Sequence, residues 1–134
     1  MPIENTWLIA DRVMGLRLWD TVTNDDLLQI DKALIEALDS SPAEQVHFIS
    51  HELDLVQEPS ISAYVQLKIP RHARFGYYVV IQPPQNILAR FVTRMACTVF
   101  KINFTSVESE ERAWQYLHQM DATISMPAQS VVEA

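Results

Sequence analysis

The chain has 134 residues, 49% of them hydrophobic, and a formal net charge of −7. This length suits one domain with a core of its own and is short for two. The acidic balance argues against nonspecific binding to nucleic acid, because that affinity comes from Lys and Arg side chains that neutralise phosphates.

The single cysteine, Cys97, lies in an apolar stretch and has no disulfide partner within the chain. It predicts a buried thiol in a reducing compartment, so we expect a cytoplasmic protein. No apolar run reaches the length of a signal peptide or a membrane span, which predicts neither export nor membrane insertion. No cofactor is predicted, because two isolated glycines cannot build a phosphate-binding loop.

The first third of the chain predicts a β-hairpin followed by a helix. Apolar and aromatic residues fill Trp7–Ala10 and Val13–Trp19, and the polar pair between them suits a tight turn. Thr23 then precedes three acidic or amide residues, as at a capped helix start. Apolar residues continue at helical spacing to Leu38, and Pro42 follows the helix end.

The middle predicts two buried strands, Val46–Ser50 and Tyr77–Ile81, separated by a polar loop through Glu58 and a short helix. That helix starts near Pro59 and ends before Pro70.

The last third predicts an amphipathic helix, a half-exposed strand and a final helix. The strand is expected at Phe100–Phe104, where apolar residues alternate with polar ones. Thr105 and Ser106 would then cap the final helix. The apolar face of the first of these helices comprises Ile87, Leu88, Phe91, Val92 and Met95, and that of the second comprises Ala113, Trp114, Leu117 and Met120.

The resulting order is β-β-α-β-α-β-α-β-α. It predicts an α/β fold with a mostly parallel sheet, an N-terminal antiparallel hairpin and helices packed on the sheet. Residues 1–124 are expected to form one domain, and residues 125–134 a flexible tail.

This order and its motifs resemble the STAS-like superfamily, the anti-sigma-factor-antagonist-like fold, and especially its divergent SpoIIAA-like branch of small stand-alone bacterial proteins. The resemblance covers about Trp7 to Ile124 and implies a non-enzymatic regulatory or protein-interaction domain. The residues that carry it are Gly15–Trp19 with Thr23–Leu27, Val46–Ile49, Gly76–Val80, and Ser109–Trp114 with Leu117.

In phosphorylated members of that superfamily, an Asp-Ser motif with a nearby glycine opens the helix after the central strand, and its phosphoserine controls partner binding. The corresponding segment here, Glu58–Ala63, lacks the Asp-Ser pair and the glycine. Ser60 and Ser62 are therefore candidates by position only, because a phosphate at a helix start meets unpaired N–H groups. Helix capping is the favoured alternative for both serines.

Metal binding and catalysis have little support in the sequence. His51-Glu52 begins like a zinc-protease motif, but Leu55 replaces the second histidine. His51, Glu52 and Asp54 could instead form a weak site at the carboxyl end of the central strand, where open α/β sheets bind ligands, although a solvated loop is favoured. No nucleophile has an adjacent base, so we predict no enzyme and no metal site.

Residues 59–107 contain six Lys or Arg residues and no Asp or Glu. The set Arg71, His72, Arg74, Arg90 and Arg94 is a candidate anion-binding region. Pairing of these side chains with the acidic faces of the first and last helices, within the chain or across a dimer, is the favoured alternative.

The aromatic residues are numerous for a small domain, and most are expected in the core. A surplus around Tyr64, Phe75 and Tyr77 could line an apolar pocket or a partner surface.

Two functional hypotheses follow. The first is regulatory protein interaction, as a monomer or a homodimer, through the second helix and its preceding loop, with Ser60, Ser62 and His51 at the surface. The second is binding of a small amphipathic, lipid-like anion by the sheet end and the basic residues. An enzyme is the least favoured class, with His51 and Glu52 as its only starting point.

Overall fold

The computed structural model describes residues 2–83 and 87–127, and for residues 87–89 and 92 it describes the backbone alone. One five-stranded sheet, in the order β1-β2-β3-β4-β5, forms the centre of this part of the chain. β1 and β2 are antiparallel, and β2 to β5 are parallel. The strands are β1 Ile3–Ile9, β2 Val13–Thr21, β3 Val46–Gln57, β4 Phe75–Ile81 and β5 Phe104–Val107.

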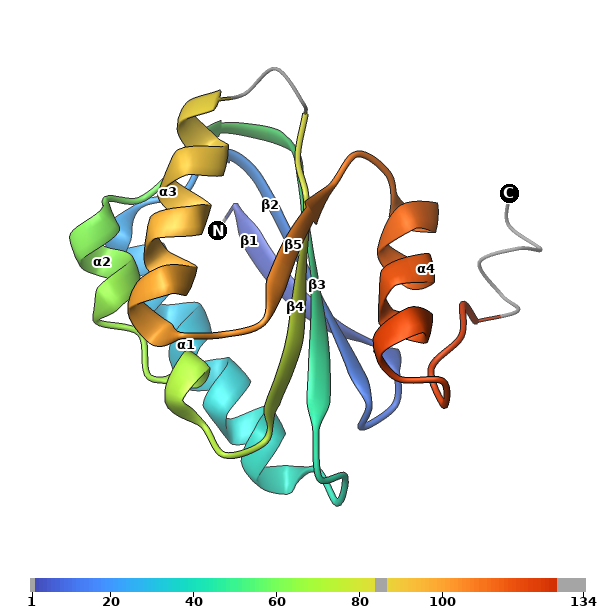
Figure 1. The fold of residues 1–134 in the computed structure, drawn as a ribbon. Helices are drawn as coiled ribbons and strands as arrows, with labels where there is room; N and C mark the ends of the chain where they lie inside the picture. Colours follow the sequence, from blue (N-terminus) through green and yellow to red (C-terminus); the bar gives the residue numbers. More distant parts are fainter. Residues whose placement is uncertain (1, 84–86, 128–134) are drawn as a thin grey trace.

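Helices cover the two faces of the sheet unequally (Figure 1). Three of them, α1 (Asn24–Ser40), α2 (Ile61–Val65) and α3 (Ile87–Phe100), lie on one face, and α4 (Glu110–Met120) lies on the other. The predicted α/β order with an N-terminal hairpin is therefore confirmed. None of the helices in the described ranges is both long and apolar enough to cross a membrane.

The first helix begins as its sequence predicts. The Thr23 side chain accepts a hydrogen bond from the Asp26 N–H, and the Asp26 carboxylate accepts one from the Thr23 N–H, which completes a capping box. The apolar face of the helix is buried against the sheet through Leu27, Ile30, Leu34 and Leu38.

Two predicted boundaries around β3 and α2 are wrong. β3 continues past Ser50 to Gln57, so His51, Glu52 and Asp54 belong to a strand and not to a loop. In a strand, successive side chains point to opposite faces of the sheet, so His51 and Glu52 lie on different faces. The polar composition alone resembles that of a loop. The second helix is only five residues long and is followed by a 3-10 turn, Ile69–Arg71.

Three predictions near the end of the chain are also wrong. α3 extends to Phe100 because its apolar spacing continues through Ala96 and Cys97, and it stops where Lys101 adopts a positive φ of 56°. The strand lies at Phe104–Val107 and includes the residues predicted as a cap, and Ser109 caps α4 instead. Met120, predicted to face the core, is exposed, and the predicted face of α3 includes side chains of residues 87, 88 and 92 that lie outside the described part.

A hydrogen-bonded latch fixes α4 on its face of the sheet. His47 of β3 is fully buried, and its Nδ1 accepts the Tyr77 N–H at 3.0 Å, so the ring proton is on Nε2. That Nε2 donates to Asp121, just after α4, at 2.9 Å. Asp121 also accepts from Arg12 at 3.1 Å. A side chain at Gly76 would come within 2.4 Å of the His47 ring, so the latch requires a glycine there.

Candidate functional site

A cavity of about 80 Å³ lies between the sheet and the helices α1, α2 and α3. Its wall is mostly apolar, with Phe48, Phe75 and Leu18 from the strands and Leu34, Ala96 and Phe100 from the helices. By order of magnitude, a cavity needs only about 10–15 Å³ to hold one water molecule, and an engineered cavity of about 150 Å³ holds benzene. The space therefore suits a slender apolar chain.

The short α2 explains why the cavity stays open. Only Tyr64 and Leu67 from the α2 region reach the wall, and the 3-10 turn adds Ile69 and Pro70. This segment is fixed from the side of α1, because the buried Asp31 carboxylate accepts the backbone N–H groups of Lys68 and Ile69 at 2.9–3.1 Å. The segment is thus held in place while supplying few side chains to fill the interior.

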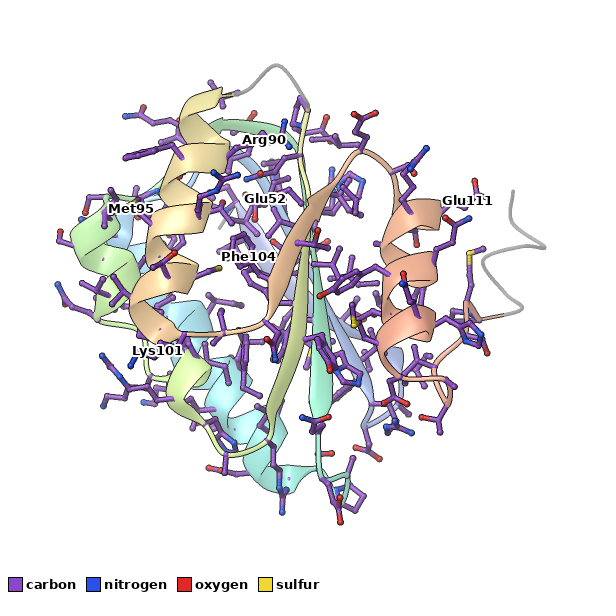
Figure 2. The ribbon with its side chains drawn as sticks, in the orientation of Figure 1. Glu52, Arg90, Met95, Lys101, Phe104 and Glu111 are labelled. Carbon is purple, nitrogen blue, oxygen red and sulfur yellow. The ribbon has the colours of Figure 1, made fainter. Side chains whose placement is uncertain are left out.

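One end of the cavity is polar. The side chains of Ser50 and Glu52, two residues apart on β3, point to the same face of the sheet because side chains alternate along a strand. Ser50 Oγ donates to Glu52 Oε2 at 2.7 Å. Figure 2 shows Glu52 in the space between α3 and the sheet. This end corresponds to the carboxyl ends of the parallel strands, where open α/β sheets commonly bind ligands.

Gln82, only 2% exposed, extends the polar end across three elements. It hydrogen bonds to Glu52, its Nε2 donates to Thr93 of α3 at 2.9 Å, and its Oε1 accepts from Ser106 of β5 at 3.2 Å. The Tyr78 hydroxyl of β4 hydrogen bonds to Ser50. Side chains from β3, β4, β5 and α3 therefore join in one buried network.

Burial raises the pKa of Glu52 from 4.5 to about 7, although hydrogen bonds from Ser50 and Gln82 act in the opposite direction. Burial, together with the negative charge of Glu52, also raises the pKa of Glu58 to about 8. Glu58 Oε1 is buried and has no hydrogen-bond partner in the described part of the protein. Near neutral pH, Glu52 can therefore either donate or accept a proton in a hydrogen bond.

Cys97 lines the same cavity from α3. It is buried, as predicted from its apolar surroundings. Burial and the neighbouring Glu52 charge raise the pKa of its thiol to about 12, which keeps the sulfur protonated and a poor nucleophile.

His51 is separated from Glu52 by the sheet. Its side chain lines a second hollow, on the α4 side, with Glu4, Arg17 and Glu110. His51 Nδ1 is buried there without a hydrogen-bond partner among the described residues. The structure therefore does not bring His51 and Glu52 together as one acid–base site, and Asp54 pairs instead with Arg17 at 3.8 Å.

The two candidate serines lie together at the start of α2. Ser60 is the N-cap, and its Oγ accepts the Ala63 N–H at 3.3 Å, as the capping alternative predicts. Ser62 Oγ lies 2.9 Å from Ser60 Oγ, and both residues are exposed. His51, on the other face of the sheet, is not part of this surface.

The basic residues do not gather into one site. His72 pairs with Asp39 of α1 at 2.8 Å, and Arg74 donates to the carbonyls of Leu38 and Ser41 at the end of that helix. Arg71 lies over the Phe100 ring at 4.9 Å. Arg90 and Arg94 are exposed residues of α3.

The aromatic residues predicted to line a pocket also separate. Tyr64 and Phe75 line the cavity, and Phe75 stacks on Phe48 with ring centres 4.8 Å apart. Tyr77 lies on the α4 side, where its ring contacts His47 and Tyr116.

Sequence reasoning missed most of the polar end, namely Ser50, Tyr78, Gln82 and Thr93. The available signal was the alternation of Ser50 and Glu52 directly after an apolar strand, which predicts polar side chains on one face of a continued strand. Gln82 and Thr93 carry no such signal, because their contacts join segments distant in sequence.

The fold and the cavity together define a small α/β domain with an apolar chamber under three helices. No protein-family model matches this chain, and no curated protein matches its sequence. Among solved structures it is similar to an uncharacterized protein of the DUF3478 family from Shewanella loihica PV-4, which has a SpoIIAA-like fold. The TM-score is 0.63 at 19% sequence identity, over 86% of this chain and 91% of that one. This confirms the predicted SpoIIAA-like fold.

Proposed function

We propose that this protein is a non-enzymatic binding domain whose cavity between the sheet and α1–α3 holds the apolar part of a small amphipathic molecule. The observation that carries the proposal is an apolar chamber with a buried polar network at one end. Ligand sites in proteins commonly combine an apolar wall with a few placed polar groups that orient the ligand.

The energetic cost of the empty chamber also supports binding. At about 24 cal/mol per Å³, a void of 80 Å³ costs the fold about 2 kcal/mol. A ligand that fills the void recovers contacts of this order and stabilises the folded state.

The test compares the protein with a variant whose chamber is filled. Native mass spectrometry of freshly purified protein is expected to show a retained small molecule, and 1-hexanol is expected to raise the melting temperature of the ligand-free protein. Ala96→Leu places a larger side chain in the wall and should abolish this rise. Val99→Ala, on the exposed side of the same helix, is the matched control and should retain it.

A clean ligand-free mass, together with no thermal shift from hexanol in the parent protein, would contradict the proposal. An equal shift in the parent protein and in Ala96→Leu would show that hexanol binds elsewhere.

A second candidate function is protein interaction through the outer side of α3. Phe91, Met95 and Val99 recur every four residues and are 54%, 41% and 52% exposed. Figure 2 shows Met95 on the side of α3 away from the sheet. With the exposed Arg94 on the same helix, this stripe suits a partner with an apolar face and an acidic rim.

Light scattering and affinity capture test this second function. Phe91→Ser with Val99→Ser should abolish capture of a specific partner, or self-association if the partner is a second copy. Ser60→Ala with Ser62→Ala examines the predicted α2 surface in the same assay. Capture that is unchanged in the α3 variant would remove this candidate.

A further inference from the structure

We infer that the ligand is an alkylamine. Its ammonium group would donate hydrogen bonds to Glu52 and Ser50 at the buried polar end of the cavity. This inference rests on the proposed function and adds the chemistry of the head group. It replaces the anionic head group that the basic residues of the sequence suggested.

The charge of the cavity wall carries the argument. Two carboxyl groups, Asp31 and Glu52, line the cavity, and no Lys, Arg or His does so among the described residues. The oxygens of Asp31 are occupied by the N–H groups of Lys68 and Ile69. Glu52 therefore remains the acidic group available to a ligand.

Glu52 also has unused hydrogen-bonding capacity. It is 5% exposed and interacts with two side chains, Ser50 and Gln82. An ionised carboxylate has about four lone-pair positions. An ammonium group has three N–H donors, so it can bind Glu52 and a neighbouring hydroxyl at the same time.

In the described ranges, the groups whose pKa values respond to the charge of Glu52 carry no positive charge. Those that face it are Glu58 beyond β3, Tyr64 of α2, Tyr78 of β4 and Cys97 of α3. Each of these four side chains is neutral when protonated and negative when deprotonated, so none of them can be positively charged. A carboxylate ligand would bring a second anion beside Glu52, whereas an ammonium group would offset the charge of Glu52 and of Glu58.

Three ligands with the same six-carbon chain but different head groups separate the contribution of the head group to affinity from that of the apolar chain. Binding of hexylamine, 1-hexanol and hexanoate is measured by calorimetry at pH 6 and pH 8. Hexylamine should bind best at pH 8 and lose about tenfold in affinity at pH 6, because Glu52 must then release a proton to accept the cation. Hexanoate should show the opposite trend, and hexanol a weaker dependence on pH.

Glu52→Gln identifies the group responsible. The amide keeps the shape of the side chain and removes its charge, so hexylamine should lose its advantage over hexanol while hexanol still binds. Asp54→Asn removes an exposed carboxylate of the same strand that does not line the cavity, so it is the matched control and should keep the preference for the amine.

The outcomes distinguish the two proposals. If hexanol binds in the chamber but hexylamine has no advantage at pH 8, or keeps it in Glu52→Gln, the head-group inference is overturned and the proposed function stands. If no six-carbon ligand binds, both are overturned.

Discussion

Two carboxyl groups on opposite faces of the sheet have pKa values shifted in opposite directions. On the α4 face, hydrogen bonds from Thr123 and His47 hold the pKa of Asp121 well below its usual range. On the three-helix face, burial raises the pKa of Glu52 to about 7. Both carboxyl groups depend on β3. Glu52 belongs to this strand, and Asp121 binds His47 of the same strand, whose side chain points to the opposite face of the sheet.

The difference shows how one strand fastens a helix on one face and, in the function we propose, binds a ligand on the other. The α4 face uses its polar groups to fasten a helix, and each nitrogen of the His47 ring has a partner. The three-helix face contains the cavity and Glu52, whose carboxylate has unused hydrogen-bond acceptor positions. A carboxyl group whose pKa is strongly shifted by burial beside a cavity is a candidate for a functional site.

The largest expected effect concerns the reactivity of Cys97. A thiol with a pKa near 12 has about a thousandfold less thiolate at pH 8 than one with an ordinary pKa near 9. Alkylation of the folded protein should therefore be about a thousandfold slower than in urea, where the thiol is exposed. Hexanol bound in the cavity should slow the alkylation of Cys97 further. Mass spectrometry of samples taken over time measures both rates. Equal rates in the folded and unfolded protein would show that the cavity face is open to reagents.

The next effect tests the packing of the α4 face. Gly76→Ala should lower the free energy of unfolding by about 3 kcal/mol, because the new methyl group would overlap the His47 ring. Urea unfolding measures this change. In a His47→Ala background the same substitution should cost under about 1 kcal/mol, because the ring is gone. An equal cost in both backgrounds would place the clash elsewhere.

Glu52 should make the cavity face less stable as pH rises. Between its ordinary pKa of 4.5 and its folded value of about 7, the unfolded chain has already released this proton and the folded protein has not, so stability falls with rising pH. Glu52→Gln should remove the share of this dependence that comes from Glu52, leave the share that comes from Glu58, and raise stability at pH 8 by up to about 3 kcal/mol. Urea unfolding from pH 5 to pH 8 measures it. The parent protein and variant should converge at pH 5; parallel profiles would contradict the prediction.

Asp121 should show the smaller and opposite dependence. Its lowered pKa contributes stability that is present at neutral pH and lost as pH falls below about 4. Asp121→Asn should cost about 1–2 kcal/mol at pH 7 through the weakened bonds to His47 and Arg12, and should flatten the acid limb of the profile. A variant as stable as the parent protein at pH 7 would show that the latch contributes little.

Local sequence signals predicted the elements that depend on neighbouring residues. The capping box at Thr23 and the apolar run at Tyr77–Ile81 each specify their structure within a few residues. The weaker predictions involved boundaries, such as the end of β3 at Gln57. The residues at the carboxyl end of β3 have the composition of a loop. Their pairing with β2 is what makes them part of the strand.

The sequence by itself determined the α/β order, the SpoIIAA-like resemblance and the burial of Cys97, because hydrophobic period and capping act over short distances. Only the tertiary structure decided that His51 and Glu52 face opposite sides, that Arg74 binds the end of α1, and that Ser50, Glu52, Gln82 and Thr93 meet around a cavity. The physical reason is that the cavity is space left between segments. Its existence depends on how α1, α2 and α3 pack against the sheet, which no single segment specifies.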